Sequence, residues 1–300
     1  YLPNLKLCLG KKYLILIINM KNKDRIILFY SNDKKTFENN FDKIKIETDL
    51  NEYDKKIIFF QNPLLWGKIK NINGYEFHFD SLELWLFQSE FFNLKQKIIK
   101  NYKEIAYHVK YLTVHSKVSY DYFKKINSNV FIKIIKNGVD LDDFKSNKSI
   151  KLPFENDNFI IGIVGIFSEN YDYPLLIKLV NKFPKISWVF IGRFHLVHLN
   201  RKKIVQQKDK LFQMDNVHLV PYGSLKKISP FIKKFNIGLV PYSTEETDND
   251  YWKSRDVLKK YQYWACGIDV LSSKIDDVEK GYEKYIYYYN DYDDVVNYIE

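Results

Sequence analysis

The chain has 300 residues, of which 46% are hydrophobic and 17% aromatic, and its net charge is +10. This composition excludes a disordered chain, and the length allows two domains that each bury a core. Residues 1–150 hold 26 basic and 17 acidic side chains, whereas residues 151–300 hold 21 and 20. The basic first half fits an anionic membrane surface or a phosphorylated acceptor, and an ordinary solvated surface fits it equally well.

Cysteine content and hydrophobic runs indicate a cytoplasmic chain. The two cysteines, Cys8 and Cys266, are far apart and indicate no disulfide framework, which fits a reducing compartment. No window of 18 apolar residues occurs, so no membrane-spanning helix is predicted. The chain begins at Tyr1, so we expect a fragment that lacks an N-terminal piece, and its helical end leaves open that a C-terminal piece is missing as well.

Short β-rich runs alternate with helical stretches along the chain, which predicts parallel, doubly wound α/β sheets. Strands are expected at residues 13–19, 25–30, 43–47, 56–61, 75–80, 111–115, 130–136, 159–166, 187–192, 217–221, 237–242, 268–272 and 285–289. Helices are expected at residues 81–108, 117–126, 172–183, 226–234, 256–266 and 291–300.

A polar stretch at residues 144–158 divides the chain. It contains Pro153 and lacks periodicity, so we expect it to link a first domain over residues 1–150 to a second over residues 151–300. Directly after it, "FIIGIVGIF" is a continuous apolar run typical of a strand buried in a parallel sheet. Two such sheets would face a cleft at the carboxyl ends of their strands, where doubly wound proteins bind ligands.

In the first half, strand 75–80 carries two candidate catalytic residues. Asp80 lies at its carboxyl end and could orient or deprotonate an acceptor hydroxyl, and His78 could do so from one step deeper. A structural role is the alternative for both. His115 and Ser116 also end a strand, but no third group completes a Ser–His arrangement.

The helical stretch 93–110 has an apolar face and five lysines. It could lie on an anionic membrane, and a core-packed helix with a solvated basic face is the alternative. No RNA or DNA motif accompanies the charge, so we expect no nucleic-acid partner. No histidine cluster is present, so we expect no metal site, and the acidic run at 245–250 is interpreted as a solvated loop.

In the second half, two turns could meet a phosphate group. Gly165 follows the first strand, and a glycine there allows a phosphate to approach the backbone and the next helix, although a tight turn explains it as well. Arg193 ends the strand "WVFIGR" and could clamp a phosphate, with an ordinary surface arginine as the alternative. Neither a G-x-G-x-x-G motif nor a P-loop is present.

The stretch "DVLKKYQYWACGIDVLSS", residues 256–273, predicts one helix capped by Asp256 and then one strand. Its apolar stripe of Leu258, Tyr261 and Ala265 is expected to face the core. Arg255, Lys259 and Gln262 recur at helical spacing, so two cations and an amide are expected on a second face of the helix.

Together these stretches resemble the GT-B glycosyltransferases, in the large retaining family that transfers sugars to glycans, lipids and small acceptors. The resemblance covers about residues 75–300 and includes "YLTVHS", "IKNGVDLDDF", "GIVGIF", "SWVFIG", "VHLVPYGS" and "FNIGLVPYS". The helix at 256–266 is similar to the family's K-x-x-E-Y-x-A-x-G signature. "YEFHFD" is similar to the acidic strand end of a branch that builds bacterial cell-surface polysaccharides.

The resemblance implies a GT-B fold, in which two doubly wound Rossmann-like domains face a cleft, with the acceptor side in 1–150 and the donor side in 151–300. It implies that Lys259 neutralises the donor diphosphate. It also implies that Gln262 and Ser254 occupy the positions of two signature glutamates, the first of which holds the ribose. The implied donor-binding residues are Gly165, Phe167, Arg193, Tyr222, Gly223, Pro241, Tyr242, Arg255, Lys259 and Gln262.

The implied activity is transfer of a sugar from a nucleoside-diphosphate sugar to a glycan or lipid-linked acceptor in surface polysaccharide biosynthesis. We expect retention of configuration, no metal or other cofactor, and a cytoplasmic location, at the inner face of the membrane where the acceptor is lipid-linked. Because both signature carboxylates are replaced, a catalytically degenerate homologue that acts as a binding or scaffold protein is an alternative. A sugar-nucleotide epimerase is another.

Overall fold

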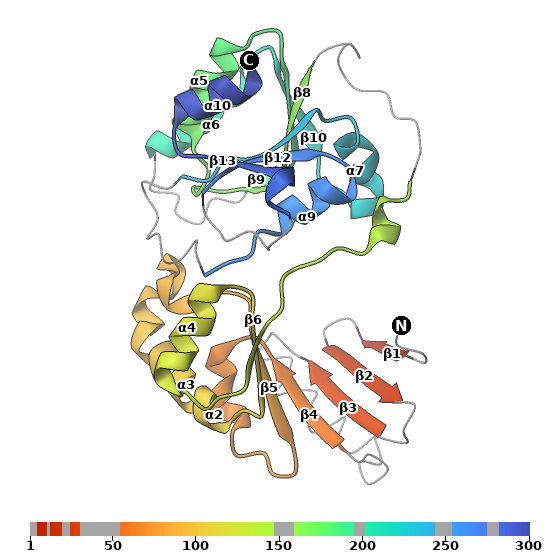
Figure 1. Cartoon of the computed structure of the whole chain (residues 1–300), viewed down its shortest axis with the longest axis vertical. Coiled ribbons are helices and arrows are strands. Elements are labelled where there is room, and N and C mark those ends of the chain that lie inside the picture. Colours follow the sequence, from red (N-terminus) through yellow and green to blue (C-terminus); the bar gives the residue numbers. More distant parts are fainter. Residues whose placement is uncertain are drawn as a thin grey trace. The chain divides into compact units, whose positions relative to one another are not determined.

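The computed structural model describes residues 5–10, 13–19, 25–30, 55–146, 159–194, 202–243, 254–274 and 282–300. The chain forms two α/β units, each with its own sheet (Figure 1). The first unit comprises Tyr1–Lys136 and Lys253–Asp256, and the second comprises Asn137–Trp252 and Val257–Glu300. The expected boundary at 150/151 and the expected strand at 43–47 lie outside the described residues.

The seven strands of the first sheet lie in the same order in space as along the chain. The first three pair antiparallel, and β3 to β7 pair parallel. The strands are β1 (Leu5–Gly10), β2 (Tyr13–Asn19), β3 (Arg25–Tyr30), β4 (Lys55–Phe60), β5 (Glu76–Ser81), β6 (Tyr111–Val114) and β7 (Ile132–Ile134). The carboxyl ends of β4, β5 and β6 therefore lie at one edge of this sheet.

The helices described in the first unit are α2 (Trp66–Ile69), α3 (Lys95–His108) and α4 (Lys117–Ile126). The long helix expected from residue 81 begins only at Lys95, and 3-10 turns precede it. The reason lies in the backbone donors of this segment. The Leu84 amide donates to the Ser254 hydroxyl at 3.2 Å and the Trp85 amide to the Tyr102 hydroxyl at 3.1 Å, so side chains replace the helical carbonyl partners.

The second sheet is parallel throughout, with the strand order β10–β9–β8–β11–β12–β13. The chain runs outward from the central β8 to β10 and then returns to β11 on the other side of β8. The strands are β8 (Ile160–Phe167), β9 (Ser187–Phe194), β10 (Val217–Pro221), β11 (Ile237–Val240), β12 (Asp269–Ser273) and β13 (Ile286–Tyr289). This reversal makes the β8/β11 junction the topological switch point of a doubly wound sheet.

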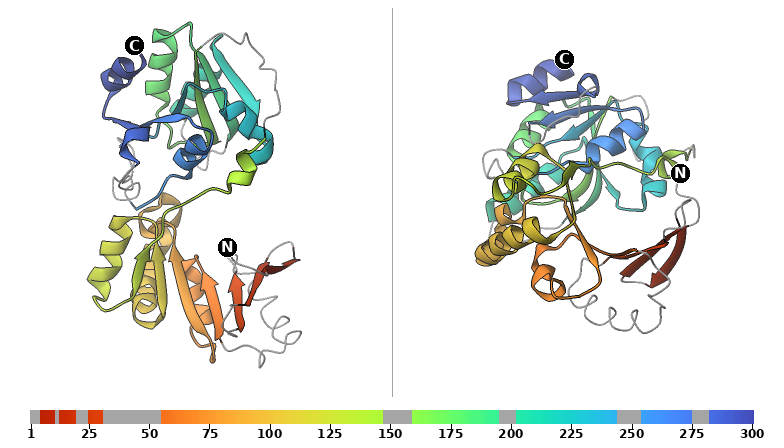
Figure 2. Two further views of the ribbon diagram at one scale, coloured as in Figure 1. Left: turned by 45° about the vertical axis from the view of Figure 1, so that its right-hand side comes forward. Right: turned by 60° about the horizontal axis from the view of Figure 1, so that its bottom comes forward.

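Helices cover both faces of the second sheet, as the order of the strands requires. α5, α6 and α10 lie on one face, and α7 and α9 lie on the other (Figure 1, Figure 2). Their bounds are α5 (Tyr173–Lys182), α6 (Lys202–Phe212), α7 (Leu225–Ile232), α9 (Leu258–Ala265) and α10 (Tyr292–Ile299). Because both faces are covered, the central strands are apolar and buried, as in the segment Ile160–Val164.

α9 packs on the sheet through Tyr263, which is fully buried. Its ring lies against Gly238 of β11, where a Cβ would stand 2.5 Å from the nearest ring atom. The expectation that Leu258, Tyr261 and Ala265 face the core is wrong for Leu258, which is 43% exposed, whereas Ala265 does pack against the core. The central contact is Tyr263. In a helix of eight residues, a single large side chain that fits opposite a glycine outweighs a weak apolar periodicity.

No helix in the described ranges is both long enough and apolar enough to cross a membrane.

Gly238→Ala should destabilise the second unit, because the new methyl group and the Tyr263 ring cannot share the same space. We expect a loss of about 1–3 kcal/mol in the free energy of unfolding, the usual cost of overpacking a core. Denaturant unfolding followed by tryptophan fluorescence measures it. Gly138→Ala is the matched control in the same unit, since nothing lies within 4 Å of its added Cβ. Equal stability of both variants would contradict this account of α9 packing.

Candidate functional site

The switch point of the second sheet is a place where two neighbouring strands separate. β8 and β11 pair only at Ile161 with Ile237 and Gly162 with Gly238. Beyond this point the Tyr263 hydroxyl accepts from the Val164 amide at 2.9 Å and lies 3.3 Å from the Gly162 and Leu239 carbonyl oxygens. One side chain therefore satisfies the backbone groups that the diverging strands leave unpaired.

Lys259 crosses the carboxyl end of β8 one helical turn before Tyr263. Gly165 has a φ of +136°, and a Cβ there would stand 2.4 Å from the Lys259 Cε. A side chain at position 165 would therefore block the path of the lysine and would also strain the backbone. The structure thus gives Gly165 a role in the placement of Lys259, in addition to the approach of a phosphate that the sequence suggested.

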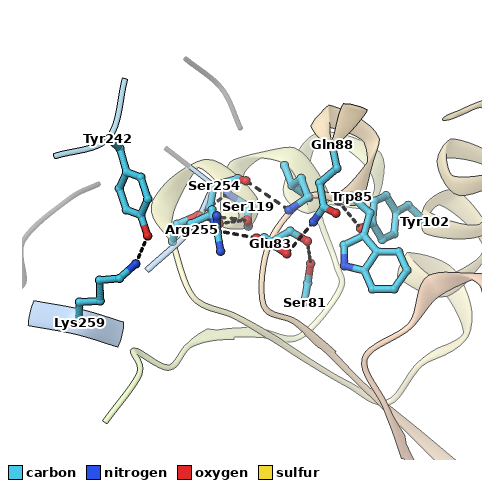
Figure 3. A network of polar contacts seen from close by, with 12 residues as sticks. Ser81, Glu83, Trp85, Gln88, Tyr102, Ser119, Tyr242, Ser254, Arg255 and Lys259 are labelled. Carbon is cyan, nitrogen blue, oxygen red and sulfur yellow. Dashed lines mark hydrogen bonds and ion pairs between the residues drawn. The ribbon is translucent and has the colours of Figure 1, made fainter. Parts of the chain in front are cut away.

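Two tyrosines surround the ammonium group of Lys259. Its Nζ donates to the Tyr242 hydroxyl (Figure 3). It lies 4.6 Å from the centroid of the Tyr242 ring and 5.4 Å from that of the Tyr171 ring. Such contacts stabilise a cation through the negative faces of the rings. Burial raises the pKa of Tyr171, so its phenol stays neutral. Within the described part of the chain, the Lys259 ammonium is held by these two tyrosines and by no carboxylate.

The loops after β8 and β11 are joined by backbone hydrogen bonds. The Asp172 amide donates to the Pro241 carbonyl and the Ser243 amide to the Asn170 carbonyl, both at 2.8 Å. Tyr171 and Tyr242 form an antiparallel bridge between the loops. These bonds fix both tyrosines at the switch point and lead into α5, whose first turn is capped by Asp172.

A second polar cluster lies at the carboxyl ends of β4, β5 and β6 in the first unit. Asp80 accepts from Gln61 Nε2 at 2.7 Å through Oδ2 and from the Thr113 hydroxyl at 2.5 Å through Oδ1. His115 Nε2 lies 3.4 Å from the same Oδ1. Burial acts to raise the pKa of Asp80, but the hydrogen bonds from His115, Thr113 and Gln61 together lower it below its usual value.

His78 reaches this cluster through Thr113. Its Nε2 lies 3.1 Å from the Thr113 hydroxyl oxygen. Burial lowers the pKa of His78, and the negative charge of Asp80 opposes that shift only in part. His78 is therefore neutral at physiological pH, and it lies one contact away from the Asp80 carboxylate.

No protein-family model and no curated protein matches the chain. Among solved structures, sucrose-phosphate synthase from Thermosynechococcus elongatus is 16% identical, with a TM-score of 0.64 over 88% of this chain and 68% of that chain. Anabaena HepE in complex with UDP-glucose is 16% identical, with a TM-score of 0.59 over 90% and 74%. An S. aureus TarM variant in complex with Fondaparinux, alpha-GlcNAc-glycerol and UDP is 12% identical, with a TM-score of 0.56 over 98% and 67%. The chain has the GT-B fold.

In this GT-B chain, four of the ten expected donor-binding residues gather at the switch point, namely Gly165, Pro241, Tyr242 and Lys259. Gln262 lies on α9, half-buried. Tyr171, which completes the surroundings of Lys259, was not expected from the sequence. A signal for it exists, since a tyrosine follows both β8 and β11 within a few residues.

Phe167, Arg193 and the pair Tyr222–Gly223 lie at the ends of β8, β9 and β10. Phe167 is buried among Phe190, Phe194 and Phe212, so it packs the core at the end of β8. Arg193 is exposed on β9, in register with the residue after Gly165. Tyr222 and Gly223 follow β10, two strands away from β8 in the sheet order, and Tyr222 is 60% exposed.

Arg255 does not share a helix face with Lys259, contrary to expectation. α9 begins at Leu258 with Val257 as its N-cap, so neither Arg255 nor Asp256 belongs to the helix. Arg255 belongs instead to the first unit, where its Nε lies 2.7 Å from Glu83 Oε2. The physical reason is that residues 254–256 are held by the first unit before the helix can start.

Ser254 is the centre of this attachment and is fully buried. Its hydroxyl accepts from the Leu84 amide, and its carbonyl accepts from the hydroxyls of Ser116 at 3.0 Å and Ser119 at 3.2 Å (Figure 3). A serine therefore anchors the chain at the position where the resembling family has a glutamate. We call Ser254 and Arg255 with these partners the anchor.

No group of three His, Cys, Asp or Glu side chains that could hold a metal ion occurs in the part of the chain that the structure describes. The expectation of a metal-independent reaction stays a prediction.

The Arg255–Glu83 pair should contribute measurably to the stability of the first unit. Its side chains are only 32% and 21% exposed, and Gln88 Nε2 donates to the other Glu83 oxygen at 2.6 Å. A double-mutant cycle with Arg255→Ala and Glu83→Ala should give a coupling of about 1 kcal/mol, at the upper end for partly exposed pairs.

The matched control for this cycle is the Lys145–Asp142 pair, whose side chains are 75% and 68% exposed. Water screens that pair, so its coupling in the same denaturant measurement should be close to zero. Equal coupling energies for the two pairs would contradict the importance assigned to the anchor.

Proposed function

We propose that the chain is a glycosyltransferase that moves a sugar from a nucleoside-diphosphate sugar to a hydroxyl acceptor. The observation that carries this proposal is the position of the Lys259 ammonium at the switch point of the second sheet, across Gly165. Doubly wound sheets bind nucleotides at this point. The GT-B fold supports the same conclusion.

The surroundings of Lys259 suit an anionic ligand. In the part of the chain that the structure describes, the contacts that hold its ammonium come from Tyr171 and Tyr242, and no ion pair is among them. When the anomeric bond of a sugar nucleotide breaks, negative charge grows on the departing diphosphate. A fixed cation at that place stabilises the transition state more than the ground state.

Details of the reaction follow from the fold by analogy. HepE was solved with UDP-glucose and TarM with UDP, which supports a UDP-sugar as the donor of this chain. TarM was also solved with Fondaparinux and alpha-GlcNAc-glycerol, which supports a glycan or glycan-like acceptor. We further propose retention of configuration, a reaction without metal, and a role in surface polysaccharide synthesis in the cytoplasm.

A non-catalytic, nucleotide-binding homologue is the second candidate. The observation that favours it is the replacement of both signature carboxylates, by the buried anchor residue Ser254 and by the amide Gln262. Such a protein would bind UDP through Lys259 and show no turnover of any UDP-sugar. A glycosyltransferase would bind UDP and release it from UDP-sugar in the presence of an acceptor.

Lys259→Met should weaken the binding of UDP. The variant keeps the aliphatic stem beside Gly165 and removes the charge, so we expect a loss of about 1–3 kcal/mol, on the order of tenfold to a hundredfold in Kd. Titration calorimetry of the full chain with UDP, GDP and UDP-glucose measures this loss.

Lys210→Met is the matched control for Lys259→Met, because Lys210 is exposed on α6. Its Kd for UDP should equal that of the unmodified chain. Absence of binding by any of the three nucleotides at millimolar concentration would refute the proposed function. Equal affinity of Lys259→Met and Lys210→Met would show that Lys259 does not meet the diphosphate.

We also propose that the first unit rests on an anionic membrane surface when the acceptor is lipid-linked. Lys97, Lys100 and Lys103 of α3 are exposed, and the preceding turn presents Phe92 at 74% exposure. Lysines near such a surface contribute about 1 kcal/mol each, so replacing all three by Gln should lower partitioning on the order of a hundredfold. Flotation with phosphatidylserine-containing liposomes measures it.

The control for the liposome experiment replaces three exposed lysines of the second unit, Lys202, Lys203 and Lys210, by Gln. Net charge then changes equally, and partitioning should fall much less than in the α3 variant. Equal loss in both variants would indicate an attraction that depends only on total charge, which would contradict a specific membrane face.

A further inference from the structure

The polar cluster of the first unit contains one buried acceptor that the protein itself does not use. This atom is Nδ1 of His115, which has no hydrogen-bond partner among the described residues. Nδ1 itself is buried, whereas the side chains of His115 and Asp80 as wholes are 8% and 11% exposed, so the cluster reaches the surface at its edge. Because buried polar atoms are almost always paired, an unpaired one at a strand end calls for an explanation.

Asp80 faces three donors from its own unit. Gln61 donates to one oxygen, and Thr113 and His115 face the other. Phe60 pairs with Phe79 and Thr113 pairs with Asp80 across the strands, so the three donors and the carboxylate come from adjacent strand ends. These contacts also lower the pKa of Asp80. A carboxylate held in this way is fixed in position and is a weak base.

The hydrogen atoms of the cluster follow from this geometry. Thr113 gives its single hydroxyl proton to Asp80, so it can only accept from His78, whose Nε2 must carry a hydrogen. His115 Nε2 faces the same carboxylate oxygen and must carry a hydrogen as well. In the neutral imidazole the other nitrogen, Nδ1, is then a bare acceptor.

We infer that His115 Nδ1 receives a hydrogen bond from a substrate hydroxyl, and that Asp80 is the positioning residue that fixes this tautomer. The inference rests on the proposed function in naming a sugar hydroxyl as the donor of that bond. It assigns to His115 the contact with the substrate that the strand pattern alone had suggested for Asp80 or His78. The bond orients the hydroxyl oxygen and involves no proton transfer.

The chemistry of the site selects neutral hydroxyl groups. A carboxylate has no proton to donate to Nδ1 at neutral pH, a phosphate monoester is mostly doubly ionised there, and the nearby Asp80 charge would repel either anion. Ser116, the next residue, is already engaged with Ser119 and Ser254, so it does not act as a nucleophile beside the histidine. The arrangement therefore fits the recognition of a carbohydrate hydroxyl rather than hydrolysis.

The tautomer can be tested without any substrate. Imidazole 15N chemical shifts of the full chain at neutral pH should identify His115 as the form with hydrogen on Nε2 and a bare Nδ1. In Asp80→Asn, which removes the charge that fixes the ring, this preference should be reduced. A hydrogen on Nδ1 in the unmodified chain would overturn the inference, whatever the outcome of the nucleotide titrations.

The ligand is tested by adding methyl glucoside, methyl galactoside and methyl mannoside to the UDP-saturated chain. We expect at least one of them to shift the His115 Nδ1 resonance toward that of a nitrogen that accepts a hydrogen bond. His115→Gln keeps a donor toward Asp80 but has no acceptor at the Nδ1 position, so it should bind that glycoside on the order of tenfold more weakly. Its Kd for UDP should not change.

The outcomes separate this inference from the proposed function. UDP binding with no Nδ1 shift from any of the three glycosides would overturn the role of His115 and leave the donor site intact. A glycoside-induced shift in a chain that binds no nucleotide would refute the transferase proposal and keep His115 as a sugar contact. A fall in UDP affinity in His115→Gln would show a general structural role and would overturn the inference.

Discussion

The site in the second unit depends on one hydroxyl group, that of Tyr263. It lies where β8 and β11 separate, accepts from the Val164 amide, and reaches the Gly162 and Leu239 carbonyl oxygens. Burial raises the pKa of Tyr263, so the phenol keeps the proton that it shares with those carbonyls. Since residues four apart lie on the same face of a helix, fixing Tyr263 also directs Lys259 across the end of β8.

The anchor explains why α9 starts where it does. Ser254 is bonded to the first unit through its hydroxyl and its carbonyl, and Arg255 is paired with Glu83. These contacts hold the backbone outside a helical conformation until Val257, the N-cap. Arg255 therefore stabilises the first unit, and Lys259 alone of the predicted basic stripe reaches the switch point. A single short stretch of sequence thus supplies residues to two different units.

Much of the fold follows from local pattern, and much of the site does not. The apolar run at β8 and the alternation of strands and helices predicted parallel α/β sheets, because burial on both faces leaves a direct trace in the sequence. The central contact of α9 was missed because it pairs Tyr263 with Gly238, 25 positions earlier in the chain. Gln61, Thr113 and His115 could not be assigned to Asp80, since only the strand register brings them together.

The two units stabilise a charged side chain in different ways. This difference relates to the two signature glutamates that Ser254 and Gln262 replace. In the first unit, three donors face the Asp80 carboxylate and use most of its acceptor capacity. In the second, neutral aromatic rings hold the Lys259 ammonium and leave its charge available. A carboxylate close to Lys259 would compete with an incoming diphosphate for that cation. Gln262, three residues after Lys259 on α9, carries no charge and so adds no such competition, and its amide can both donate and accept a hydrogen bond.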